Sequence, residues 1–132
     1  MKKQQGFSIV MAIFILVVLS LLGAYMVKLS GVQNATATYA IQSARAYQAA
    51  RAGAEWSVAR IVNGGNCTHI TAASPLNFTG LEGFSVSLAC SNTIYSEGLD
   101  NVNVYKIKST STFATYNSPD YISRRVEISI AN

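Results

Sequence analysis

The residues best suited to chemistry in this sequence are two cysteines, Cys67 and Cys90, and a single histidine, His69. Neither cysteine belongs to a CxxC pair, and one histidine cannot complete a set of ligands, so we expect no metal site. The better interpretation is a disulfide that closes the segment 67–90, and two separate buried thiols are the alternative. Chain-entropy arguments put the contribution of such a bond at about 3 kcal/mol.

The sequence does not show the residue arrangements of an enzyme. Gly64-Gly65 is followed by neither Lys-Ser/Thr nor, as far as the pattern indicates, a helix, so it does not resemble a phosphate-binding loop. Four acids of the second half of the chain fall in turn-like segments, where solvent reaches them: Glu82, Glu97, Asp100 and Asp120. We therefore predict no catalytic residues and no cofactor.

The apolar residues are concentrated near the N-terminus. Half of the chain is hydrophobic and 12% is charged, but residues 7–27 contain no charged side chain. As a helix this stretch is about 31 Å long, the thickness of the hydrocarbon core of a bilayer. It reads as a secretory signal, as a signal anchor, or as a helix retained after processing at Gly6. The length of the run and the lack of an A-x-A site argue against the first, and a glycine at the border suggests the third.

The charge distribution gives no sign of nucleic-acid binding. The net charge is +4, and Lys2 and Lys3 supply two of the positive charges. The other basic residues are scattered and form no Lys/Arg stripe. Under the positive-inside rule, the two lysines favour a cytoplasmic N-terminus.

The segment after Lys28 is dense in alanine and has no proline before position 75, which predicts that the helix continues. Asn63-Gly64-Gly65-Asn66 predicts its end, so one nearly continuous helix is expected over 7–62. We expect its part from Tyr47 to Ile61 to pack on the C-terminal region. These residues belong to a stripe that recurs at spacings of three, four or seven: Ala40, Ala44, Tyr47, Ala54, Val58 and Ile61.

The C-terminal region alternates as β-strands do. Residues 84–91 and 121–131 each place apolar side chains on one face, and Arg124 interrupts the second set, which suggests an edge. Residues 101–116 change phase at Val104-Tyr105, which suggests a bulge or a bend. The predicted fold class is α+β: a long N-terminal hydrophobic and amphipathic helix with a small antiparallel sheet packed on its distal half.

The N-terminal stretch "KKQQGFSIVMAIFILVVLSLLGAYMVKLS" resembles the start of type IV pilins and pseudopilins. The resemblance implies that Gly6 ends a leader and that a prepilin peptidase cleaves before Phe7 and N-methylates it. It also implies that the helix leaves the inner membrane to pack with other major and minor pilins in a filament. The residues expected to form this membrane and filament-core surface are Ile9, Val10, Met11, Ile13, Phe14, Leu16 and Val17.

The stretch "SARAYQAARAGAEWSVARI" is similar to minor pilins of the MSHA (mannose-sensitive hemagglutinin) biogenesis type. The chain departs from most major pilins at Met11, where they carry a glutamate thought to meet the N-terminal amine of a neighbouring subunit. The absence of this glutamate favours a priming or tip subunit over a shaft subunit. The alternative is that this position drifted neutrally.

The resemblance implies four regions: a leader at 1–6, a transmembrane and filament-core helix at 7–28, its amphipathic continuation at 29–62, and a disulfide-bonded periplasmic domain at 63–132. The expected route is a single-pass inner-membrane protein with a cytoplasmic N-terminus, and then the pilus at the cell surface.

Three other functions are compatible with the same sequence. The chain is alternatively a signal-anchored periplasmic binding domain, a pseudopilin of a secretion system, or an adhesive tip lectin. The lectin would use exposed tyrosines as a sugar platform: Tyr95, Tyr105, Tyr116 and Tyr121.

Overall fold

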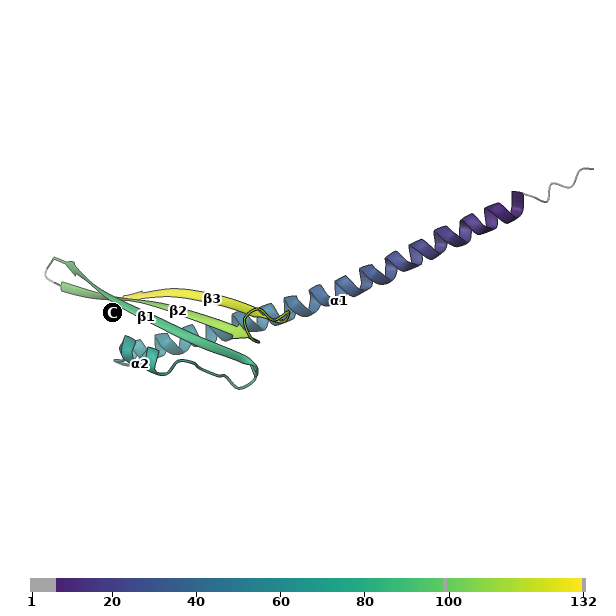
Figure 1. The fold of residues 1–132 in the computed structure, drawn as a ribbon. Helices are drawn as coiled ribbons and strands as arrows, with labels where there is room; N and C mark the ends of the chain where they lie inside the picture. The colour runs from purple at the N-terminus through teal and green to yellow at the C-terminus, as the bar shows by residue number, and fades with distance from the viewer. Residues whose placement is uncertain (1–6, 99, 132) are drawn as a thin grey trace, which may run out of the picture. The chain divides into compact units, whose positions relative to one another are not determined.

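The structure is a computed structural model that describes residues 7–98 and 100–131 (Figure 1). Its elements are, in chain order, α1 (Phe7–Val62), α2 (Cys67–Ala72), β1 (Phe84–Glu97), β2 (Asp100–Phe113) and β3 (Ile122–Ala131). The chain divides into two units, Met1–Tyr39 and Ala40–Asn132, with the boundary inside α1. The α+β fold predicted from the sequence is confirmed.

The long helix α1 runs without interruption over the predicted range. It ends because Gly64 adopts a positive φ of 81°, a conformation that costs glycine nothing. The N–H of Gly64 donates to the carbonyl of Ile61 at 3.0 Å, and the N–H of Gly65 donates to Arg60 at 2.8 Å. These two bonds form a Schellman motif, which satisfies the carbonyls that the helix end would leave unpaired.

The short helix α2 is a correction to the expectation that no helix follows Gly64-Gly65. Asn66 caps it: its side-chain oxygen accepts a hydrogen bond from the backbone N–H of His69 at 3.1 Å. Six residues are too few for a periodic pattern to show, so only the capping asparagine marks this helix in the sequence.

The sheet is an antiparallel meander with the order β1-β2-β3. Its register is continuous from Phe84↔Phe113 to Glu97↔Asp100, so the bulge predicted at Val104-Tyr105 is wrong. The apparent change of phase arises because Val102 and Val104 are apolar although they alternate with the inward positions of β2, where Ile107, Ser109 and Ser111 are buried. The alternation changes in residue type while the backbone remains regular.

The second part of α1 packs on the inner face of this sheet through small residues. Of the stripe residues predicted to pack, Ala54 and Ile61 are buried and Val58 is half-buried, whereas Tyr47 is exposed and that prediction is wrong. Tyr47 remains 48% exposed because the buried face lies at other positions of the helix. The side of α1 that faces the sheet consists of Ala46, Ala49, Ala50, Gly53, Ala54, Ser57 and Ile61.

Gly53 marks the closest approach of helix and sheet. A Cβ atom added there would lie 2.5 Å from the Ser109 Oγ and 2.6 Å from the Val86 Cγ1. Only glycine fits at this separation, and small serines on β2 serve the same purpose. The Oγ atoms of Ser109 and Ser111 have no hydrogen-bond partner among the described residues, so close packing here comes at the cost of two unsatisfied hydroxyls.

Arg124 lies on β3, an edge strand of the sheet, so its predicted place near an edge is confirmed. Its Nε donates a hydrogen bond to the Ser43 Oγ of α1 at 2.9 Å. Because β3 is an edge strand, the guanidinium group reaches the helix from the rim of the sheet while remaining exposed.

Candidate functional site

The first unit presents an apolar helical surface that the described residues leave uncovered. Every residue from Ser8 to Ile41 is exposed. The predicted membrane and filament-core side chains of this unit are between 52% and 67% exposed: Ile9, Val10, Met11, Ile13, Phe14, Leu16 and Val17. Monomeric soluble proteins rarely expose a contiguous apolar area of this size, so the surface requires lipid or another protein against it.

This part of α1 is long and apolar enough to cross a membrane, by length and composition. A shallow groove runs along it, lined by residues spaced at three and four: Ile13, Leu16, Val17, Ser20 and Leu21. Such rows of side chains are the ridges and grooves through which helices pack on one another. The surface therefore suits both a lipid environment and a neighbouring helix.

Some large apolar side chains stay exposed past the length of a bilayer, where they alternate with polar residues such as Lys28, Gln33 and Asn34. Residues 8–41 cover about 50 Å along the helix axis, against about 30 Å for the hydrocarbon core. Beyond the first 21 residues of α1, Leu29 and Val32 are each 62% exposed. Thr36 and Thr38 turn their hydroxyls inward, donating to the carbonyls of Val32 and Asn34 at 3.1 and 3.0 Å. Their hydrogen-bonding needs are thus met within the helix.

The residues at the predicted processing site lie at the limit of the described chain. Phe7 is the first residue of α1, and Gly6 lies outside the described residues. The first turn of α1 contains no acidic residue, and Met11 follows it with an exposed side chain. The positive end of the helix dipole therefore has no carboxylate of its own nearby.

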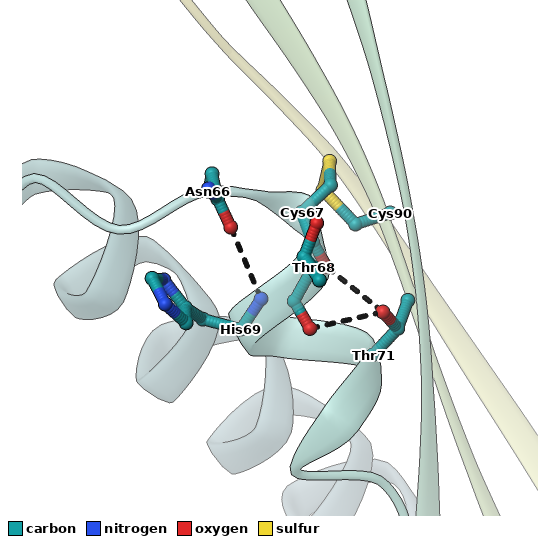
Figure 2. Close-up of a disulfide and its surroundings, with 6 residues drawn as sticks. All are labelled: Asn66, Cys67, Thr68, His69, Thr71 and Cys90. Carbon is teal, nitrogen blue, oxygen red and sulfur yellow. Dashed lines mark hydrogen bonds between the residues drawn. A yellow bond between two sulfur atoms is a disulfide. The ribbon is translucent and has the colours of Figure 1, made fainter.

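The disulfide joins Cys67, the first residue of α2, to Cys90 on β1, as predicted (Figure 2). Their Cα atoms are 5.1 Å apart. The bond attaches α2 to the sheet, and the Thr71 hydroxyl steadies α2 further by donating to the Cys67 carbonyl at 3.0 Å. Among the described residues, no three His, Cys, Asp or Glu side chains gather as metal ligands would.

The tyrosines considered as a sugar platform do not come together. Tyr95 is paired with Val102 near the β1–β2 turn, whereas Tyr116 and Tyr121 stack edge to face in the β2–β3 connection, with ring centroids 5.3 Å apart. These two places are at opposite ends of β2. Tyr105 packs against the hydrophobic core instead. The four rings therefore form no single surface.

The loop before β1 holds the carboxylate whose ionisation the fold alters. The backbone N–H of Gly80 donates to the Glu82 Oε1 at 2.8 Å. This hydrogen bond, with smaller contributions from the N–H of Glu82 and the positive charge of Arg45, lowers the pKa of the Glu82 carboxyl. The loop is thereby stabilised in the ionised form.

Sequence reasoning missed a pocket at the end of α1. Its walls include Trp56 and Arg60 from α1 and His69 from α2, and its volume is about 380 Å³. The tryptophan and the histidine are each unique in the chain, which was the available signal. Their proximity depended on α2, which was not expected.

No protein-family model, no curated protein and no solved structure matches this chain.

Proposed function

We propose that this chain is a minor pilin of a type IV pilus of the MSHA type, which enters the filament through the first part of α1 and acts in assembly or priming. The observation that carries the proposal is that residues 8–27 expose a continuous apolar surface and that large apolar side chains stay exposed beyond it, at Leu29, Val32 and Ile41. A simple membrane anchor has no need of the excess length, whereas a helix that exchanges lipid for neighbouring helices does.

The leader pattern supports the same proposal. Lys2 and Lys3 precede Gly6 and Phe7, as in prepilins, and removal of two charges from the helix end would ease its extraction from the bilayer. In this proposal the second unit lies in the periplasm before assembly. The periplasm is an oxidising compartment, in which the Cys67–Cys90 disulfide persists.

Met11 supports a place at the end of the filament. A subunit whose own helix start lacks a carboxylate can have its amine neutralised by a neighbour but cannot neutralise the next one. A subunit that occurs once, at a tip, has no need to do so.

The first test is the mass of the mature protein purified from its own bacterium. The proposal expects a chain that begins at N-methylated Phe7 and retains the helix. A chain that still begins at Met1 would instead identify a signal-anchored periplasmic domain, and a chain cut after the apolar helix would identify a secreted protein. Either result contradicts the proposal.

A second test uses position 11. Met11→Glu restores the missing carboxylate, and Met11→Gln is the matched control of similar shape without charge. If this residue limits the subunit to the filament end, Met11→Glu raises the number of copies per filament in quantitative immunoblots of sheared pili, and Met11→Gln does not. Equal copy numbers for both variants would refute the role assigned to Met11.

Deletion in the native host separates priming from adhesion. Loss of all filaments, counted by electron microscopy and restored by the complementing chain, supports a role in initiation. Normal filament numbers with lost adhesion would point to a receptor role at the tip. Normal filaments with normal adhesion would contradict both.

A further inference from the structure

The pocket at the end of α1 has the composition of a binding site for a small polar ligand. Its lining combines an aromatic ring, a guanidinium group, an imidazole and an amide with two glycines and an alanine: Trp56, Arg60, Asn63, Gly64, Gly65, His69 and Ala73. Its volume, about 380 Å³, is in the range of about 300–1,000 Å³ typical of ligand pockets.

The polar side chains Arg60, Asn63 and His69 of the pocket are exposed at the surface, and contacts within the chain hold the first two in place. The Arg60 guanidinium lies over the Trp56 ring, 5.0 Å from its centroid, so a cation–π interaction fixes the charge at the wall. Asn63 donates from its Nδ2 to the Ala59 carbonyl at 2.7 Å, which orients its amide. His69 lies on the side of α2 away from Cys90, and the cap and the disulfide hold that helix (Figure 2).

The pocket is electropositive and has unused hydrogen-bonding capacity. Its lining includes no aspartate or glutamate. Among the described residues, the Arg60 guanidinium has no carboxylate partner; the nearest arginine along α1, Arg51, is by contrast paired with Glu55 at 2.8 Å. The backbone N–H groups of Gly64 and Gly65 are already bonded within the helix end, so side chains are the available donors.

We propose that this pocket binds an acidic sugar residue, such as a uronic acid within a polysaccharide. The carboxylate would pair with the planar guanidinium of Arg60, which suits bidentate contacts. Sugar hydroxyls both donate and accept hydrogen bonds, which matches the Oδ1 of Asn63 and the ring nitrogens of His69. The edge of Trp56 provides an apolar wall for the sugar ring.

This inference is independent of the proposed function in the filament. The pocket is built from residues 56–73 of one chain and needs no neighbouring subunit. A protein that fails to assemble into pili could still bind the sugar, and a pilin could lack sugar binding.

The experiment titrates the full chain, in detergent micelles, with tri-galacturonate. Trp56 is the only tryptophan, so intrinsic fluorescence reports directly on the pocket. We expect a saturable change that is absent with the neutral trisaccharide maltotriose. Isothermal titration calorimetry measures the same affinity without relying on the ring.

Two variants test the residues. Arg60→Gln should weaken tri-galacturonate binding at least tenfold, and the matched control Arg51→Gln, an arginine on the same helix outside the pocket, should leave it unchanged. His69→Leu, which retains Arg60, should weaken binding by a smaller factor. Thermal unfolding of each variant, followed by fluorescence, verifies that the fold is intact.

The inference is overturned if tri-galacturonate produces no heat and no fluorescence change, or if Arg60→Gln binds as well as the unmodified chain. Equal binding of maltotriose would show that charge plays no role. Competition by inorganic phosphate at the same concentration as the sugar would show a general anion site instead, which also contradicts the assignment.

Discussion

Replacement of Gly53 tests how closely the helix and the sheet are packed. In an exposed helix, a change from glycine to alanine stabilises by about 1 kcal/mol because alanine restricts the unfolded backbone. At Gly53 the added methyl group would come within 2.6 Å of two buried side chains, Ser109 and Val86, on different strands. Val86 is β-branched and fully buried, so it cannot easily turn away.

The magnitude follows from these two opposing effects. Overpacking of a buried site costs about 1–3 kcal/mol, and the gain in helix propensity offsets about 1 kcal/mol of this cost. We therefore expect Gly53→Ala to destabilise the second unit by up to about 2 kcal/mol. For a domain of this size, each kcal/mol lowers the Tm by about 4–8 °C.

The assay is thermal unfolding of the full chain in detergent, followed by the near-UV circular dichroism of Trp56, which lies in the second unit. Gly31→Ala is the matched control, because a Cβ there meets nothing within 4 Å, and it should not lower the Tm. In the double variant with Val86→Ala, room is made for the new methyl group, so its loss of stability should be smaller than the sum of the two single losses by at least about 0.5 kcal/mol.

The reasoning is refuted if Gly53→Ala raises the free energy of unfolding, as it would at an exposed position. Strict additivity with Val86→Ala would also refute it, because it would show that the two side chains do not compete for the same space.

Three further predictions concern the disulfide, the loop and the membrane helix. Replacement of Cys67 and Cys90 by serine should lower the free energy of unfolding by about 3 kcal/mol, which denaturant titration with and without reductant measures. Because the folded pKa of Glu82 is lowered, its stabilising contribution is present above the unfolded pKa and lost as pH falls through the folded pKa; Glu82→Gln should therefore lower the Tm at neutral pH and match the unmodified chain in acid. Leu16→Arg should reduce membrane insertion at a cost of about 2.5–3.5 kcal/mol, seen as release of the chain by carbonate extraction, while Leu16→Ile should not.

The length of α1 and the pairing of Cys67 with Cys90 could be predicted because each depends on local or pairwise signals. Alanine density and the Gly64-Gly65 stop determine the helix, and the chain has only two cysteines. The buried face of the helix could not be placed in the same way. Periodicity favoured Tyr47 because it is large and apolar, but the sheet approaches so closely at Gly53 that the contact face accepts only small side chains near it.

The wrongly predicted bulge has a different cause. Val102 and Val104 are apolar residues on the outer face of β2, while the inward positions Ser109 and Ser111 carry serines that are buried opposite the small residues of α1. A serine at such a place is selected by its volume, and its polarity is tolerated. The pocket was missed for a different reason. It depends on where α2 lies in space, and the only sign of α2 in the sequence is its capping residue, Asn66.

Residue volume, more than hydrophobicity, separates the two surfaces of α1. The part that packs on its own sheet uses alanine, glycine and serine, which bring two backbones close and fix one geometry. The exposed part keeps leucine, isoleucine, valine and phenylalanine, whose large side chains suit lipid as well as the ridges of another helix. A helix intended only to anchor the domain could carry large residues to the edge of the bilayer and polar ones beyond it. Leu29, Val32 and Ile41 remain exposed past that edge, which such an anchor does not need; in the proposed filament a neighbouring helix would cover them.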